Sequence, residues 1–125
     1  MRFLGAVSHD ELPRLFARAR CFVLPGEEDF GIAPVEAQAA GRPVLAFGRG
    51  GALETVVEYE TGVFFKEPTV ESLVDGIAAI ERMEVDPARI RAHAQRFDVT
   101  RFGREMRSAI ELVRDQTQPK GERQP

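Results

Sequence analysis

Cysteine, histidine and long apolar runs are scarce in this sequence, and each scarcity excludes a class of protein. The single cysteine, Cys21, excludes a disulfide framework. With only two histidines, His9 and His93, both expected at the surface, a zinc site is not expected. No apolar run is long enough to span a bilayer, and the segment after Met1 lacks the pattern of a signal peptide. The net charge of -3 leaves no basic stripe, so we expect no nucleic-acid partner.

The composition that is present is ordinary for a globular α/β domain. The 125 residues include 43% hydrophobic and 30% charged side chains, which is enough for one hydrophobic core. Cys21 lies inside the apolar segment CFVLP, where a free thiol behaves as a small buried hydrophobe. We therefore expect one cytoplasmic domain over residues 1–115, followed by a polar, disordered tail over residues 116–125.

Short apolar runs alternate with helical patterns along the chain. The predicted strands are FLGAV (3–7), CFVLP (21–25), PVLAF (43–47) and TGVFF (61–65). They are continuous apolar runs, which are typical of a parallel sheet covered on both faces by helices. We therefore predict a three-layer, Rossmann-like α/β fold with a short, mainly parallel sheet of about four strands.

The predicted helices carry recognisable start signals. Ser8 and Glu11 have the capping-box spacing at the start of one helix, and Asp86-Pro87 opens another. The last helix is predicted from a cap at Thr100 through Val113. The remaining helices are expected over 33–40, 52–58 and 69–83, the last of these with Leu73, Ile77 and Ile80 facing inward.

The stretch PGEEDFGIAPVEA (25–37) lies where a strand gives way to a helix, which is where parallel sheets bind ligands. Gly31 permits close approach of the backbone, and the following helix directs its first amides and positive dipole end toward the loop. Such a helix start can bind an anion such as phosphate. Glu28 and Glu36 flank it, and ionised carboxylates accept hydrogen bonds from diols. Spacing alone leaves equally open that both are solvated acids near a helix start.

A second glycine-rich loop, GRGG (48–51), follows the next predicted strand. The carboxyl ends of neighbouring parallel strands meet at one edge of a sheet. We therefore expect Gly50, Gly51 and Glu54 to lie beside the first loop. A tight turn, with Glu54 paired locally, explains the same residues equally well.

The segment EDFGIAPVEAQAAGRPVLAFGRGGALETVVEYETGVFF (28–65) resembles the donor-binding core of retaining, nucleotide-sugar-dependent glycosyltransferases with the GT-B fold, in the large fourth family. That family has a Glu, an F-G-[LI] tripeptide, a second Glu opening A-x-A-x-G-x-P-V, and then G-G-x-x-E. The sequences GGALETV and TGVFF are most similar to those of mannosyltransferase-like members. The resemblance as a whole spans residues 3–102. The sequence keeps each element, in Glu28, Phe30-Gly31-Ile32, Glu36, Gly41, Pro43-Val44, Gly50-Gly51, Glu54 and Thr61-Gly62.

The resemblance implies a role for each residue of this site. Glu28, in the catalytic position, would contact hydroxyls of the donor sugar. Backbone amides of Phe30, Gly31 and Ile32 would approach the sugar and the diphosphate, and Glu36 would hold the ribose diol. Transfer would proceed by a front-face displacement stabilised electrostatically, with no metal or other cofactor. A supporting loop would contain Gly50, Gly51 and Glu54.

The resemblance also implies partners and a place in the cell. The donor would be GDP-mannose or a UDP-sugar. The similarity of the sequence to mannosyltransferase-like members favours GDP-mannose. The acceptor would be a glycan, a lipid-linked sugar or a small molecule. Members of the family often act at the cytosolic face of a membrane, so peripheral association with that inner face is left open beside a purely cytoplasmic location.

The chain departs from the family pattern in what precedes its first strand. The acceptor-binding domain, two opening strand–helix units, and the Arg and Lys that hold the donor diphosphate have no counterpart in the sequence. We therefore expect the isolated chain to be inactive. The missing strands would lie between 3–7 and 21–25, so we expect either a rearranged four-stranded sheet or a homodimer that covers the open edge.

Two other classes of protein compete with this interpretation. A non-catalytic α/β module, binding a sugar nucleotide or another protein, would have the same fold without the transfer activity. A receiver-like signalling domain also fits the length, but the paired acids, phosphorylatable Asp and Lys that it needs are not suitably placed.

Overall fold

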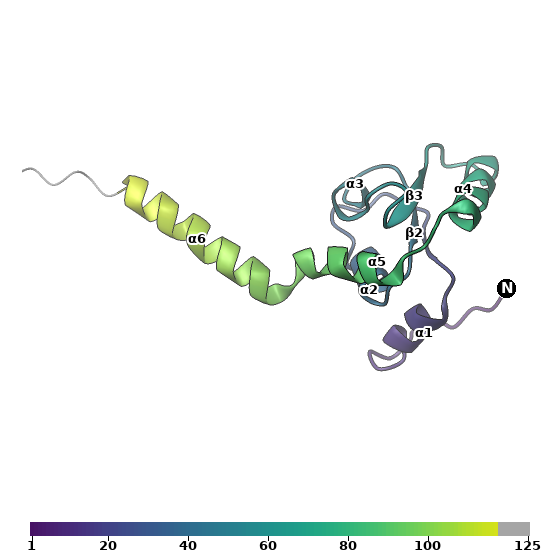
Figure 1. The fold of residues 1–125 in the computed structure, drawn as a ribbon, viewed down its shortest axis with the longest axis horizontal. Coiled ribbons are helices and arrows are strands. Elements are labelled where there is room, and N and C mark those ends of the chain that lie inside the picture. The colour runs from purple at the N-terminus through teal and green to yellow at the C-terminus, as the bar shows by residue number, and fades with distance from the viewer. Residues whose placement is uncertain (118–125) are drawn as a thin grey trace, which may run out of the picture. The chain divides into compact units, whose positions relative to one another are not determined.

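The computed structural model describes residues 1–117, which divide into two compact units, residues 1–95 and the segment from residue 96 onward. The first unit contains a three-stranded parallel sheet in the order β1-β2-β3. Figure 1 labels two of these strands, β2 and β3. The predicted α/β class with a short parallel sheet is confirmed. The elements of this unit are α1 (Leu12–Arg18), β1 (Phe22–Leu24), α2 (Ile32–Ala39), β2 (Val44–Phe47), α3 (Ala52–Thr55), β3 (Gly62–Phe65), α4 (Val70–Arg82) and α5 (Pro87–Ala94).

Strand β2 is the centre of the sheet and its most buried strand. The register pairs Val23 with Leu45 and Leu45 with Val63. All residues of β2 are buried, as its continuous apolar run predicts, whereas Val23 of β1 is 38% exposed. Strand β1 is therefore an edge, and within the described residues it has a neighbouring strand on one side only.

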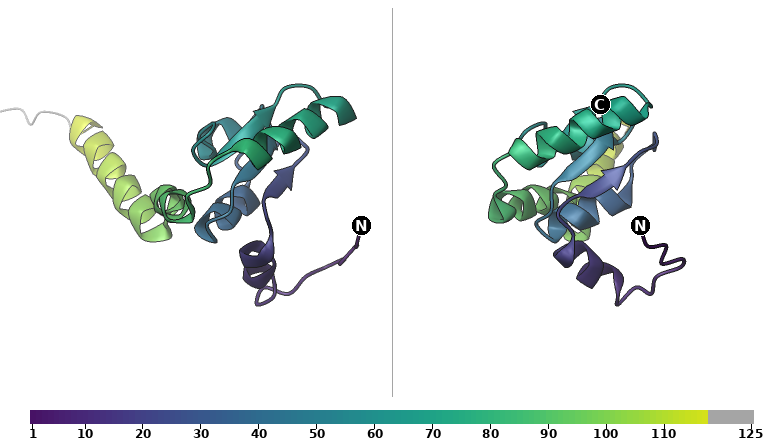
Figure 2. Two further views of the ribbon diagram at one scale, coloured as in Figure 1. Left: turned by 45° about the vertical axis from the view of Figure 1, so that its right-hand side comes forward. Right: turned by 90° about the vertical axis from the view of Figure 1, so that its right-hand side faces the viewer.

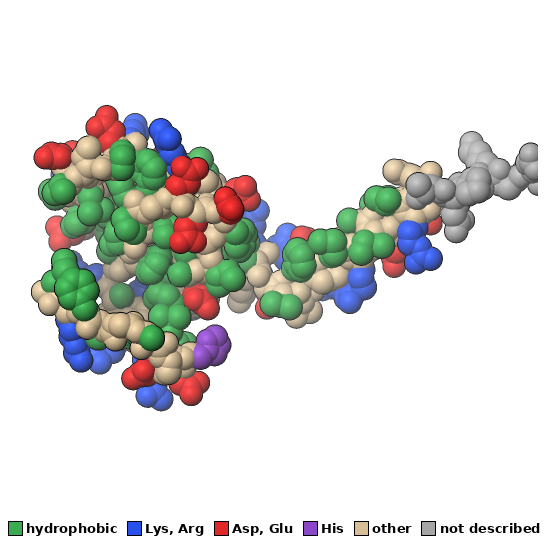
Figure 3. All heavy atoms as spheres, turned by 180° about the vertical axis from the view of Figure 1, so that it is seen from behind, with side chains coloured by type: hydrophobic (Ala, Val, Ile, Leu, Met, Phe, Trp, Pro, Cys, Tyr) green, Lys and Arg blue, Asp and Glu red, His purple; other side chains and the backbone are tan. Residues whose placement is uncertain are grey.

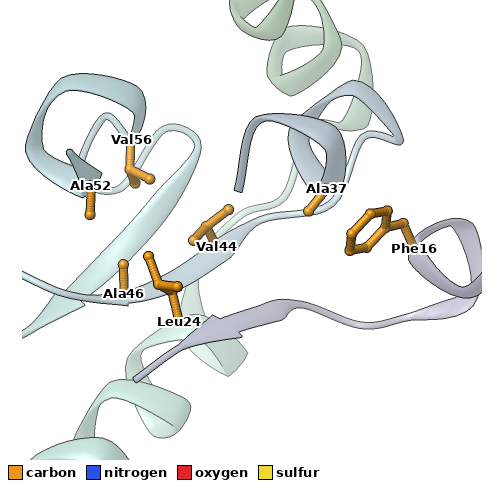
Figure 4. Packing of buried hydrophobic residues seen from close by; sticks show 7 residues of the cluster. All are labelled: Phe16, Leu24, Ala37, Val44, Ala46, Ala52 and Val56. Carbon is orange, nitrogen blue, oxygen red and sulfur yellow. The ribbon is translucent and has the colours of Figure 1, made fainter. Parts of the chain in front are cut away.

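Helices cover both faces of the sheet, which confirms the predicted layering (Figure 2). On one face, side chains of β1 and β2 pack against α1, α2 and the region of α3 (Figure 4). On the other face, side chains of β2 and β3 pack against α4. The first cluster contains Phe16, Leu24, Ala37, Val44, Ala46, Ala52 and Val56. The second contains Leu45, Phe47, Val63, Phe65 and Ile80.

Helix α4 rests on the sheet through a glycine. A Cβ on Gly76 would lie 2.7 Å from Leu45 Cδ1, so the helix approaches the sheet closely there. Ile80 is buried and Leu73 half-buried, as predicted, but Ile77 is 43% exposed. The prediction for Ile77 was wrong because the buried stripe passes through Gly76, and the next residue is rotated by about 100° around the helix axis.

Residues 3–7 do not form the predicted strand. Phe3 and Leu4 are exposed, and Gly5 has a φ of 64°, which interrupts an extended run. A strand needs a neighbouring strand to which its backbone can form hydrogen bonds. None of the strands of the sheet lies beside residues 3–7 within the described part of the chain. Within residues 1–117 the sheet therefore has three strands, one fewer than predicted, and the rearranged four-stranded sheet is not formed.

Two of the predicted helix starts are confirmed by their hydrogen bonds. Ser8 Oγ accepts from Glu11 N at 3.3 Å, and Glu11 Oε2 accepts from Ser8 N at 3.4 Å, just before α1. Asp86 Oδ1 accepts from the backbone amides of Ala88 and Arg89 at 3.0 and 3.2 Å, which caps α5. These side chains satisfy amides that no preceding helical turn can satisfy.

The segment from residue 96 onward consists, through residue 117, of the end of a 3-10 turn (Gln95–Phe97) and helix α6 (Val99–Thr117). Asp98 caps α6, and not Thr100 as predicted, because Asp98 Oδ1 accepts from Thr100 N at 2.8 Å. That backbone hydrogen bond lowers the pKa of Asp98. Residues 116 and 117 are helical, and the rest of the predicted disordered tail, 118–125, lies outside the described residues.

Helix α6 is amphipathic. Figure 3 shows apolar side chains in a row along this helix, with charged side chains beside them. None of the helices in residues 1–117 is long and apolar enough to cross a membrane. The exposed apolar residues of α6 are Val99, Phe102, Met106, Ile110, Leu112 and Val113.

Gly62, at the start of β3, occupies a position with no room for a side chain. A Cβ there would collide with Val44 O and lie 2.8 Å from Val56 Cγ1. We expect Gly62→Ala to destabilise the protein by about 2–3 kcal/mol in chemical denaturation, because the backbone of the neighbouring strand must move. The control is Gly26→Ala, where a Cβ meets nothing within 4 Å. Equal free energies of unfolding for the two variants would contradict the prediction.

Candidate functional site

The loops that follow β1 and β2 meet at one edge of the sheet, as parallel strands require. Gly51 N donates a hydrogen bond to Glu28 O at 2.6 Å. A Cβ on Gly51 would lie 2.5 Å from Phe30 Cα, and a Cβ on Gly50 would collide with Glu28 O. Backbone therefore packs directly on backbone, and only glycine fits at either position without moving the loop.

The start of α2 is the helix start that the sequence predicts as an anion site, and it is built on a glycine. Gly31 is its N-cap residue, with φ 76° and ψ 88°, a left-handed conformation that glycine adopts without steric cost. Gly31 is buried, whereas Phe30 and Ile32 on either side are 44% and 68% exposed. Among the described residues no side chain caps this helix start, so its first amides, which no preceding turn can satisfy, are left available to an anion.

Glu28 lies in an exposed acidic run with Glu27 and Asp29, directly after β1. Its backbone carbonyl is held by Gly51, while its side chain is in solvent. The main chain of Glu28 is thus fixed by a hydrogen bond, and its side chain extends from that fixed point near the C-terminal ends of the strands.

Glu36 lies in different surroundings. It is half-buried and sits in the second turn of α2, because the helix begins one residue earlier than predicted. It lines a cavity of about 300 Å³ whose other walls are mainly apolar. Glu28 does not line this cavity, so the two carboxylates that the sequence places on either side of the helix start do not share it. The other lining residues are His9, Leu12, Pro13, Phe16, Ala39 and Ala40.

Loop 48–51 and the start of α3 carry two more polar side chains. Glu54 is exposed in the first turn of α3, and its backbone amide donates to Gly51 O at 3.1 Å. The guanidinium of Arg49 lies 5.5 Å from the centroid of the Phe47 ring, a cation–π contact. The loop therefore places one cation and one carboxylate beside the two glycines.

A buried polar network behind these loops was missed by sequence reasoning. Gln38 Nε2 donates to Thr55 O at 3.0 Å and to Pro34 O at 3.2 Å. His93 Nε2 lies 3.1 Å from the same Thr55 O, and since a carbonyl only accepts, the imidazole donates. Thr55 Oγ1 in turn donates to Gly51 O at 3.2 Å. Side chains of α2, α3 and α5 are thereby joined to the glycine loop.

The expectation that His93 lies at the surface was wrong. His93 is half-buried because α5 packs against α2, with Ile90 and Ala94 buried at that contact. The signal that could have revealed the network is Gln38, a lone amide in the alanine run AQAA. It follows Pro34 by four residues and so shares a helical face with a residue that is also fully buried.

The remaining candidates for special chemistry are metal-binding clusters and the lone thiol. Within residues 1–117 no group of three or more His, Cys, Asp or Glu side chains is arranged to hold a metal ion. Burial raises the pKa of the Cys21 thiol, so the thiol stays protonated at neutral pH. Cys21 packs beside the cluster under α4, in keeping with its predicted role as a small hydrophobe.

Comparison with known proteins supplies the family. Residues 1–97 match the family described as group 1 glycosyl transferases. A glycogen synthase of Mycobacterium tuberculosis is 40% identical over 100 residues, which are 76% of this chain and 23% of the relative. A GDP-mannose-dependent alpha-(1-6)-phosphatidylinositol monomannoside mannosyltransferase of the same species is 38% identical over 86 residues, 62% of this chain and 22% of the relative. An alpha-1,3/1,6-mannosyltransferase of Dictyostelium discoideum is 37% identical over 79 residues, 62% of this chain and 19% of the relative.

These matches cover most of this chain but only a small share of each relative. The chain spans less than a quarter of the length of each of the three relatives. The family match, in contrast, covers both site loops, the cavity beside Glu36 and the buried network. The resemblance to GT-B glycosyltransferases drawn from the sequence is therefore confirmed at the level of the family, and the chain belongs to the group 1 glycosyl transferases.

Proposed function

We propose that this chain forms the donor-binding part of a retaining hexosyltransferase whose donor is GDP-mannose. The family supports glycosyl transfer. The names of two relatives, one a GDP-mannose-dependent mannosyltransferase and the other a mannosyltransferase, support the sugar. The observation that carries the proposal is the contact of Gly50 and Gly51 with the backbone of Glu28 and Phe30, which braces the loop before α2.

Glu28 is the residue to which we assign the donor sugar. An ionised carboxylate only accepts hydrogen bonds and can take two hydroxyls at once, which suits a hexose. Its main chain is held by Gly51, so its side chain starts from a defined point. The backbone amides of Phe30, Gly31 and Ile32 would then face the sugar and the diphosphate at the start of α2.

Glu36 is the residue to which we assign the ribose. Its half-buried carboxylate lines a cavity of about 300 Å³ with apolar walls, a size at the lower end of small-molecule sites. Hydrogen bonds from a diol to a charged group gain strength in such surroundings, because little water competes for them. The nucleotide end of the donor would therefore be held apart from the sugar end.

We propose that transfer needs neither a metal nor another cofactor. The amides and the positive dipole end of α2 would stabilise the charge of the departing diphosphate. Retention would follow from front-face displacement, in which the acceptor attacks on the side from which the diphosphate leaves. The chain offers Glu28 for sugar contact in this scheme, not as a covalent nucleophile.

The acceptor and the location complete the proposal. The name of one relative includes phosphatidylinositol monomannoside, which supports a lipid-linked acceptor beside a glycan or small-molecule acceptor. We propose a cytoplasmic location, in which peripheral association with the inner face of the membrane would bring the protein to a lipid-linked acceptor. A glucosyl donor is the second candidate, because one relative is named glycogen synthase. A third candidate, a non-catalytic sugar-nucleotide-binding module, would bind the same donors without transferring the sugar.

Substitution of each glutamate tests the assignment by isothermal titration with GDP-mannose, GDP, UDP-glucose and UDP. Glu36→Ala should weaken GDP and GDP-mannose alike by about tenfold or more, because both contain the ribose. Glu28→Ala should weaken GDP-mannose and leave GDP unchanged. Glu71→Ala, which removes the same charge from an exposed position on α4, is the control. Unchanged GDP affinity in Glu36→Ala would contradict the assignment of Glu36 to the ribose. Tighter binding of UDP-glucose than of GDP-mannose by the wild-type chain would identify UDP-glucose as the preferred donor.

The isolated chain is expected to bind its donor without transferring sugar. It spans less than a quarter of the length of these relatives. It therefore contains only a small part of the surface with which a relative of full length would bind donor and acceptor. A radiolabelled GDP-mannose assay with lipid and glycan acceptors should show no product above the Glu28→Ala blank. Turnover well above that blank would show that this chain is sufficient for catalysis.

We also propose that a second copy of the chain covers the open edge at β1. Unpaired strand edges favour pairing with another chain, and Val23 of this strand is 38% exposed. Light scattering after size exclusion should detect a dimer that Val23→Lys returns to a monomer. Val74→Lys, at an exposed position of α4, should leave the dimer intact. A wild-type chain that stays monomeric at high concentration would rule out this pairing.

A further inference from the structure

We propose that Gln38 and His93 are positioning residues for the sugar-binding loop. Both hold Thr55 at the end of α3, and α3 in turn holds the loop that carries Glu28. The consequence for ligand binding rests on the proposed function. The mechanical coupling between Gln38 and the loop does not, because it follows from the contacts of the protein alone.

Helix α3 needs outside support to have a defined position. It is four residues long, far shorter than a helix that is stable by itself. The carbonyl of Thr55, at its end, accepts from Gln38 Nε2 on α2 and from His93 Nε2 on α5. A carbonyl has two lone pairs, so it can accept both hydrogen bonds at once. Two donors from different helices therefore brace α3 from two sides.

The other end of α3 transmits this position to the site. Thr55 N and Thr55 Oγ1 both donate to Gly51 O, each at 3.2 Å. Gly51 N donates to Glu28 O at 2.6 Å. A continuous line of hydrogen bonds thus runs from Gln38 and His93 through Thr55 and Gly51 to the main chain of Glu28. A Cβ on Gly51 would have no room, which shows that the two loops are in direct backbone contact there.

The hydrogen bonds of Gln38 are better explained by positioning than by stability. Its side chain is fully buried, and donation to two carbonyls determines which way the amide faces, since the reverse would set oxygen against oxygen. Its Oε1 has no hydrogen-bond partner among the described residues, which is unfavourable for a buried acceptor. A methionine of similar length would lose both hydrogen bonds and also remove that acceptor, so the variant should remain folded.

The network is expected to affect one end of the donor more than the other. Glu36 belongs to α2 and lines a cavity that contains no residue of α3. Glu28, in contrast, is held through Gly51 and therefore through α3. Loosening Thr55 should reduce the affinity for the sugar and spare the affinity for the nucleotide, a separation that general destabilisation of the fold would not produce.

Amide hydrogen exchange of the full chain tests the mechanical part without any ligand. In Gln38→Met, exchange at Gly51 N should be about tenfold faster, as expected for losing the hydrogen bond that braces Thr55 O, while exchange at Leu45 and Val63 in the sheet stays unchanged. His93→Gln keeps a side-chain donor and should retain the slow exchange at Gly51 that His93→Leu loses. This matched pair also keeps the proposal testable if Gln38→Met does not fold.

Titration of the same variants with GDP-mannose and GDP tests the functional part. The ratio of the two dissociation constants should shift about tenfold against GDP-mannose in Gln38→Met and His93→Leu, and His93→Gln should restore it. Unchanged exchange at Gly51 in both Gln38→Met and His93→Leu would overturn the proposal. Faster exchange with an unchanged ratio would overturn the link to sugar binding. Faster exchange in the variants, together with a wild-type chain that binds neither ligand, would instead overturn the proposed function and leave the positioning of Gly51 supported.

Discussion

The contact of the Gly50–Gly51 backbone with the backbone of Glu28 and Phe30 is the constraint on which the candidate site depends. Neighbouring parallel strands deliver their following loops to the same edge, where side chains on both would collide. Two glycines allow the main chains to touch, so that Gly51 N reaches Glu28 O. The start of α2 and the position of α3 then follow from one contact, because each begins where one of the two loops ends.

Local and repetitive features were predictable from sequence because their physical cause lies within a few residues. The continuous apolar run 43–47 predicts the buried central strand, and Asp86-Pro87 predicts the start of α5. The glycine motif likewise predicted that the two loops after β1 and β2 lie side by side. The segment 3–7 failed because apolar composition describes a tendency to be buried, whereas a strand also needs a neighbour that the sequence pattern does not specify.

The polar interior was unpredictable for the opposite reason. Gln38 and Thr55 are 17 residues apart, and Thr55 and His93 are 38 residues apart, so no local pattern connects them. Their meeting depends on how α5 packs against α2, which is decided by apolar residues such as Ile90. The packing of α5 against α2 that partly buries His93 also brings its imidazole within hydrogen-bonding distance of Thr55 O. Its burial is thus a property of the fold and not of the surrounding charged sequence.

The strands lie in the sheet in the order in which they occur in the chain. Within the described residues, β2 and β3 therefore each pair with a strand synthesised shortly before them. Each parallel pairing spans one intervening helix, so the sequence separation between paired strands is smaller here than in a sheet whose strands are reordered. Assembly of this unit can proceed from its first strand to its last as the chain leaves the ribosome, with the central strand unprotected only until the third arrives.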